Sequence, residues 1–144
     1  MTEIQFHFNV PDRLAYACRL LRKAMRKVAG VSVLGDAGDM ERLNRQLWSF
    51  EPTEFLPHVF VRGADAVPSG LVETPLWLLT DLERCPTGHK VLVNLGAAPV
   101  GEPERFDRLV EIVSTEPDDR DAARQRWRHY AGLGFPIQKF EVPA

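Results

Sequence analysis

The first residues of the chain alternate between apolar and polar side chains. Ile4, Phe6 and Phe8 are each flanked by polar neighbours. A period of two is typical of a β-strand, because successive side chains point to opposite faces of a sheet. We therefore expect a strand over residues 3–9, with His7 on its polar face.

Beyond this segment, apolar residues recur at steps of three and four, as on one side of a helix: Leu14, Cys18, Leu21, Met25 and Val28. This spacing predicts an amphipathic helix that begins at Pro11 and ends at Gly30. Proline suits the first helical turn, since the N–H that it lacks would be unpaired there in any case. Asn9 and Asp12 are both candidates for the residue that caps this helix.

Short apolar runs alternate with helical patterns along the rest of the chain. Strands are predicted over residues 31–34, 75–80, 90–94, 108–114 and 137–142, and helices over residues 39–48 and 118–133. Such alternation favours a mostly parallel sheet flanked by helices. Because no internal repeat or low-complexity segment interrupts the pattern, we expect a single α/β domain over residues 1–144.

The composition is that of a globular protein. The chain has 144 residues, of which 44% are hydrophobic and 26% charged, and this length can bury a core without disulfides or metals. No apolar run approaches the roughly 18 to 20 residues of a membrane span, and the N-terminus lacks the pattern of a signal peptide. We therefore expect a cytoplasmic protein whose two cysteines, Cys18 and Cys85, are free thiols.

Charge is distributed unevenly along the chain. The net charge of −2 argues against a protein that coats nucleic acid through overall positive charge. However, residues 13–27 contain six basic residues and no acid, and Glu141 is the only acid in residues 122–144. Local basic faces are therefore expected on a weakly acidic protein.

Motifs that carry chemistry are absent from the sequence. Gly30, Gly35 and Gly38 flank a predicted strand instead of following one, so they do not form a phosphate-binding turn. The four histidines lack partners at metal-ligand spacing and are expected to be solvated or locally hydrogen-bonded. Adjacent acids at Asp118 and Asp119 suit a helix start. We expect no enzymatic activity, cofactor or metal, although an enzyme with an unrecognised site remains an alternative.

The final predicted helix carries an unusual row of side chains. Arg120, Arg124 and Arg128 are spaced by four, so they lie along one face, with Trp127 beside them. This arrangement suits an acidic peptide that ends in an aromatic residue or a carboxylate. It equally suits single-stranded nucleic acid, whose phosphates bind arginine and whose bases stack on tryptophan. A third interpretation is a solvated helix face with a half-buried tryptophan.

Large apolar residues also gather in a segment bounded by prolines: Trp48, Phe50, Phe55, Leu56 and Pro57. The segment is interpreted either as a loop folded onto the core or as a surface docking patch, since aromatic residues dominate interface hot spots.

Two motifs together resemble the family of the chi subunit of bacterial DNA polymerase III. One is Leu47-Trp48 followed by Phe55-Leu56-Pro57-His58, and the other is residues 123–130 running into Gly134-Phe135. The N-terminal strand and helix are also similar to that family. The resemblance implies an α/β fold like that of a nucleotide-binding domain, without a phosphate-binding loop.

The resemblance also implies a function: a non-catalytic replication adaptor with two binding faces. One face binds the acidic, phenylalanine-ended tail of single-stranded-DNA-binding protein, through Arg120, Arg124, Trp127 and Arg128. The other face binds the psi subunit of the clamp loader, or a competing helicase, through Trp48, Phe55 and Pro57. Tryptophan stands at 127 where the family commonly has tyrosine, and arginine stands at 120 where lysine can stand. The alternative is a direct single-stranded nucleic-acid-binding module that uses the basic helices.

Overall fold

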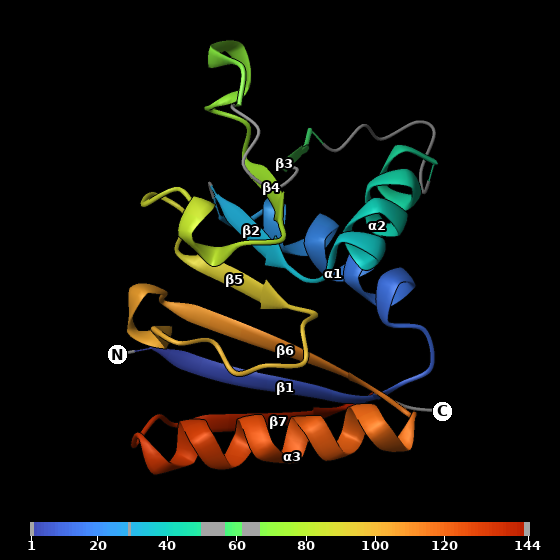
Figure 1. The fold of residues 1–144 in the computed structure, drawn as a ribbon, viewed down its shortest axis with the longest axis vertical. Helices are drawn as coiled ribbons and strands as arrows, with labels where there is room; N and C mark the ends of the chain where they lie inside the picture. Colours follow the sequence, from blue (N-terminus) through green and yellow to red (C-terminus); the bar gives the residue numbers. More distant parts are fainter. Residues whose placement is uncertain (1, 29, 50–56, 62–66, 143–144) are drawn as a thin grey trace.

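A seven-stranded parallel sheet forms the centre of the molecule in a computed structural model (Figure 1). The structure describes residues 2–28, 30–49, 57–61 and 67–142. The strands are β1 (Glu3–Val10), β2 (Val31–Leu34), β3 (Val59–Val61), β4 (Leu76–Leu79), β5 (Val91–Asn94), β6 (Arg108–Ser114) and β7 (Ile137–Glu141). Their order across the sheet is β3-β4-β2-β5-β6-β1-β7. The expected α/β class is confirmed, and every pairing is parallel.

Within the described residues, three α-helices cover the two faces of this sheet unequally. Helices α1 (Arg13–Met25) and α2 (Ala37–Ser49) pack on one face, where Leu21 and Leu43 are fully buried. Helix α3 (Pro117–Gly132) packs on the other face through Ala123 and Tyr130. Short 3-10 turns occupy Ser69–Leu71, Leu82–Arg84 and Pro103–Arg105. The two basic stretches recognised in the sequence therefore lie on opposite faces of one sheet.

Several sequence predictions need adjustment. The first helix ends at Met25, so Val28 lies beyond it and is 36% exposed. Of the two candidate caps, Asp12 is the correct one: its side chain accepts a hydrogen bond from the Ala15 N–H at 3.2 Å. Asn9 instead has a φ of 64° and lies between His7 and Val10, where the pairing of β1 with β6 shifts its register. Strand β3 was not predicted, because a three-residue strand shows no measurable periodicity.

The prediction that His7 lies on a polar strand face is wrong. Its side chain is buried, stacks on Phe140 with ring centroids 4.8 Å apart, and hydrogen-bonds to Tyr16 and Gln5. Burial lowers the pKa of this imidazole. The strand has apolar neighbours on both faces, which a simple alternation of residue types does not reveal. The prediction for the cysteines is confirmed: both are buried free thiols, and burial raises the pKa of Cys18 to about 11.

A buried ion pair anchors α3 to the sheet. The Nε of Arg126 donates to Oε1 of Glu111 on β6 at 2.8 Å, and both side chains are within 1% of complete burial. The Tyr130 hydroxyl donates to Oε2 of the same carboxylate at 2.6 Å, and the Asn94 amide donates to both carboxylate oxygens. Burial raises the pKa of Glu111, while the Arg126 guanidinium beside it opposes that rise. Each charge therefore has partners where water is excluded, as a buried pair requires.

The same cluster also holds the loop that follows β5. Arg126 donates to the Ala97 carbonyl at 3.2 Å, and the Val100 N–H donates to the Tyr130 hydroxyl at 2.8 Å. Gly96 N–H donates to the Asn94 side-chain oxygen at 2.9 Å. Burial raises the pKa of the Tyr130 phenol, so this hydroxyl stays a donor at neutral pH. One set of side chains thus fixes both the helix and the loop.

We expect Arg126→Met to lower the free energy of unfolding by about 3–5 kcal/mol, because it leaves the Glu111 carboxylate buried without its charge partner. Arg124→Met is the matched control on the exposed side of the same helix and should change stability by less than about 0.5 kcal/mol. Urea denaturation of both variants measures the difference. Equal stabilities would show that the buried pair does not anchor the helix.

Candidate functional site

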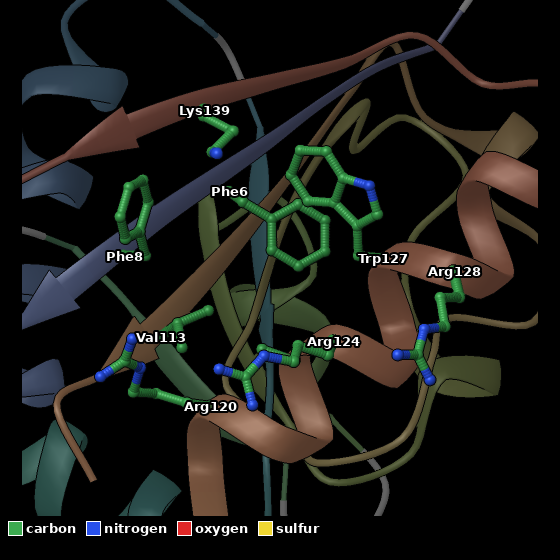
Figure 2. A pocket seen from close by; sticks show the side chains of 9 residues that line it. Phe6, Phe8, Val113, Arg120, Arg124, Trp127, Arg128 and Lys139 are labelled. Atoms are coloured by element: carbon green, nitrogen blue, oxygen red, sulfur yellow. The ribbon is translucent and has the colours of Figure 1, made fainter. Parts of the chain in front are cut away.

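A pocket of about 320 Å³ opens between α3 and the strands at one margin of the sheet (Figure 2). Its lining comes from β1, β6, α3 and β7: Phe6, Phe8, Val113, Arg120, Ala123, Arg124, Trp127, Arg128 and Lys139. Helix α3 is anchored over β6, so it leaves part of β1 and β7 uncovered. The pocket is this uncovered part of the sheet, with the helix as its wall.

The floor of the pocket is aromatic. Phe6 on β1 and Trp127 on α3 have ring centroids 5.0 Å apart with planes tilted by 51°. The tryptophan is only partly buried, so part of its ring faces the opening. Phe8 continues the same side of β1, two residues further on. Such a floor can hold an aromatic or aliphatic side chain by contact and by ring–ring packing.

The rim of the pocket is cationic. Arg120, Arg124 and Arg128 follow one another along α3, as Figure 2 shows, and all three are exposed to solvent. Lys139 approaches from β7, with its Nζ 5.9 Å from the Trp127 ring centroid and 5.7 Å from that of Phe8. Arg124 pairs with the exposed Asp121 at 2.7 Å. Within the described part of the chain, Arg120 and Arg128 have no ion-pair partner, so their charge is available to a ligand.

The chemistry of this lining is that of binding. Among the described lining residues there is no carboxylate, histidine or cysteine, so the pocket offers no general base or acid of moderate pKa. Guanidinium groups bind carboxylates through paired N–H donors, and the rings bind an apolar group. The arrangement therefore suits an anionic ligand that carries an apolar or aromatic side chain.

The structure brings together the four residues predicted from the last helix, Arg120, Arg124, Trp127 and Arg128. The sequence prediction missed the opposite wall of the pocket, which comes from other elements: Phe6, Phe8, Val113 and Lys139. Phe6 and Phe8 belong to the alternating first strand, and Val113 and Lys139 to other predicted strands, but no local pattern indicated that these strands face the last helix. Arg126, counted among the basic residues of this segment, contributes nothing to the rim, because it is buried against Glu111.

The second predicted face lies elsewhere. Trp48 is near the end of α2, is 57% exposed, and contacts the His58 ring with centroids 4.9 Å apart. Pro57, which directly precedes His58 in the sequence, is exposed. Phe55 lies outside the described residues. The exposure of Trp48 makes its ring accessible at this end of α2, and residues 50–56 of the segment lie outside the described residues. This surface belongs to the α1–α2 side of the sheet, whereas the pocket belongs to the α3 side.

Part of the edge at which open α/β sheets usually bind nucleotides is held by the protein's own side chains. Ligands of such folds bind outside the carboxyl ends of the strands. Here β5 ends at Asn94, and the loop after it is tied down by Arg126 and Tyr130. The fold and the pocket thus define an α/β binding domain that resembles nucleotide-binding domains but shows no phosphate-binding loop among its described residues.

Comparison with known proteins identifies the family. Residues 1–138 match the family described as DNA polymerase III chi subunit, HolC. DNA polymerase III subunit chi of Pseudomonas aeruginosa is 32% identical over 150 residues, an alignment that covers 99% of each chain. This chain therefore belongs to the DNA polymerase III chi subunit family, as its two motifs indicated, and has an accessory role in DNA replication. None of the described helices is long and apolar enough to cross a bilayer.

We expect no saturable binding of ATP or NAD at millimolar concentration, and no hydrolysis of ATP. Although Gly35 and Gly38 lie where β2 (Val31–Leu34) leads into α2 (Ala37–Ser49), contrary to the sequence prediction, the Asp36 carboxylate there accepts the Asp39 N–H at 2.7 Å, and two acids at this helix start repel a phosphate. The loop after β5 is likewise held by side chains. Equilibrium dialysis with each nucleotide tests this. Saturable binding that a substitution at the carboxyl edge of the sheet abolishes would contradict it.

Proposed function

We propose that this chain is a non-catalytic adaptor of the DNA polymerase III holoenzyme. Its pocket binds the acidic, phenylalanine-ended C-terminal tail of single-stranded-DNA-binding protein. Its Trp48 face binds the psi subunit, which links it to the clamp loader, or a helicase that competes for that face. The observation that carries this proposal is the pocket itself, in which an aromatic floor lies beside four cationic side chains.

The chemistry of such a tail matches both parts of the pocket. A C-terminal phenylalanine carries a ring and a carboxylate on one residue, so its ring can pack on Trp127 and Phe6 while its carboxylate reaches a guanidinium. The preceding acidic residues then face the remaining cations, Arg120 and Lys139 among them. The volume of about 320 Å³ is at the small end of ligand pockets and suits a side chain better than a large cofactor.

The proposal for psi rests on the exposed Trp48. More than half of the Trp48 surface is exposed near the end of α2, so a partner protein can reach its ring. Aromatic anchors of this kind are enriched in interface hot spots. With Phe55 and Pro57 close in sequence, Trp48 supplies an apolar face that a partner's helix or loop can cover.

Direct binding of single-stranded nucleic acid through both basic helices is the weaker candidate. Helices α1 and α3 lie on opposite faces of the sheet, so their cations do not form one continuous track along which a strand could run. The pocket also offers a single aromatic recess instead of a row of rings. We therefore favour the adaptor function.

We expect Arg124→Ala to weaken binding of a peptide of the last ten residues of single-stranded-DNA-binding protein by roughly tenfold or more, because it removes a charge-assisted bond to a carboxylate. The matched control is Arg42→Ala. Arg42 lies on α2 and forms an ion pair of 2.7 Å with Asp39, three residues before it. Arg124 forms an ion pair of the same length and spacing with Asp121. Isothermal titration calorimetry gives both affinities.

The control variant should bind the peptide as the wild type does. If Arg124→Ala binds as tightly as Arg42→Ala, the pocket is not the tail site. Poly-glutamate of the same length serves as a second probe, since the aromatic floor should make it a weaker ligand than a phenylalanine-ended peptide.

We also expect the two faces to be separable. Trp48→Ala and Phe55→Ala should weaken binding of psi, or of the protein that replaces it, and leave tail-peptide affinity within about 0.5 kcal/mol of wild type, since distant sites behave additively. Trp127→Ala should do the reverse. Pull-downs with each partner measure both interactions.

Truncating a buried tryptophan can itself cost about 3–5 kcal/mol. Only variants that still melt cooperatively are therefore compared, and Arg128→Ala serves as a second pocket variant with little effect on packing. Loss of both interactions in a folded Trp48→Ala protein would contradict the two-face arrangement.

A further inference from the structure

We propose that β7 is the second half of the peptide site: the bound tail adds to the sheet along the open edge of this strand and hydrogen-bonds to its main chain. This inference rests on the proposed function of the pocket. Strand β7 is the last of the sheet, paired with β1 on one side only. Among the described elements, no strand lies on its other side. Addition of an extended peptide to such an edge is a common mode of recognition.

The direction of each backbone group of β7 follows from its pairing with β1. The Ile4 N–H donates to the Pro136 carbonyl at 3.3 Å, and the Val142 N–H donates to the Phe8 carbonyl at 3.0 Å. In a parallel ladder, alternate residues of a strand point both backbone groups to the same neighbour. The N–H and C=O groups of residues 137, 139 and 141 therefore point away from β1, toward the open edge.

The edge and the pocket share a residue. Lys139 extends its side chain over the pocket, beside Trp127, while its own N–H and C=O point outward from the sheet. The last side chain of the bound peptide would occupy the pocket. The peptide backbone would then run as a strand along β7, from Lys139 toward Glu141. Residues 138–141 are all exposed, so no described side chain has to move to admit it.

Charge favours an acidic peptide on this edge. The cations Arg124, Arg128 and Lys139 converge on the side of β7 that faces α3. Glu141 is the one acid of the strand and lies at its far end. We infer a register in which the terminal carboxylate of the peptide and the acid nearest to it lie beside Lys139, while the peptide passes Glu141 with its main chain and not with an acidic side chain. The opposite edge of the sheet, β3, has three residues with apolar side chains and none of this charge.

Two substitutions at one position separate main chain from side chain. Lys139→Ala removes the ammonium group and keeps the outward N–H. Lys139→Pro removes both, yet leaves the ladder to β1 intact, because proline is tolerated where the N–H of an edge strand faces solvent. We expect the proline variant to bind the ten-residue tail peptide about three- to tenfold more weakly than the alanine variant, the effect of one lost hydrogen bond.

A second comparison avoids changes at the pocket. Glu141→Pro should bind more weakly than Glu141→Ala, although neither side chain lines the recess. A tail peptide with one backbone amide replaced by an ester should bind wild-type protein more weakly at alternate positions only, in the period of a strand. Far-ultraviolet circular dichroism and cooperative melting check that each variant is folded.

The outcomes are distinct. Failure of wild-type protein to bind the peptide overturns the proposed function and this inference with it. Normal wild-type binding, sensitivity to Arg124→Ala, and equal affinities within each proline–alanine pair overturn the strand-addition inference alone. An equal loss of affinity at every ester position also overturns the strand-addition inference, because it shows main-chain contacts without the alternation of a strand.

Discussion

The contact on which the binding surface depends is the buried pair of Glu111 and Arg126. A carboxylate and a guanidinium that are both removed from water require each other, and here Tyr130 and Asn94 complete their hydrogen bonds. With Arg126 directed inward, a helix of about 3.6 residues per turn turns Arg124 roughly 160° away, and Trp127 to the flank between them. One buried pair thus sets the rotation of α3 and, with it, the three arginines on the rim of the pocket.

Incomplete coverage of the sheet creates the pocket. In the described residues, three α-helices cover a seven-stranded sheet. Hydrogen bonds of Arg126 hold α3 over β6 and the loop after β5. The margin formed by β1 and β7 therefore keeps part of its apolar face open on the α3 side. The helix pair α1–α2 lies on the other side of the sheet, and α2 carries Trp48 in its last turn. An adaptor that holds two partners at once needs such a separation, because overlapping sites would make the partners exclude each other.

Local sequence patterns predicted most of the helices and strands and the part of the pocket that lies on α3. The strand over residues 31–34 and the strand over residues 108–114 were predicted to the residue, since buried parallel strands are continuous apolar runs between turns. The arginine row with Trp127 was visible because helical spacing is a local property. His7 was predicted on a polar face, and the burial of Arg126 was not predicted, for one shared reason: both are polar residues that a distant element buries and pairs. The spacing of residues within one segment does not indicate which side chains a distant segment will bury.

The sequence by itself determined the fold class, the family, and the side chains that the last helix offers to a ligand. These follow from periodicity and motifs within segments of about ten to fifteen residues. Tertiary structure alone decided which apolar residues of β1 stay open, that Lys139 joins the rim from β7, and that the two basic helices lie on opposite faces. The physical reason is strand order: β1 and β7 are neighbours although more than a hundred residues separate them in sequence, and only packing of the whole chain creates that contact.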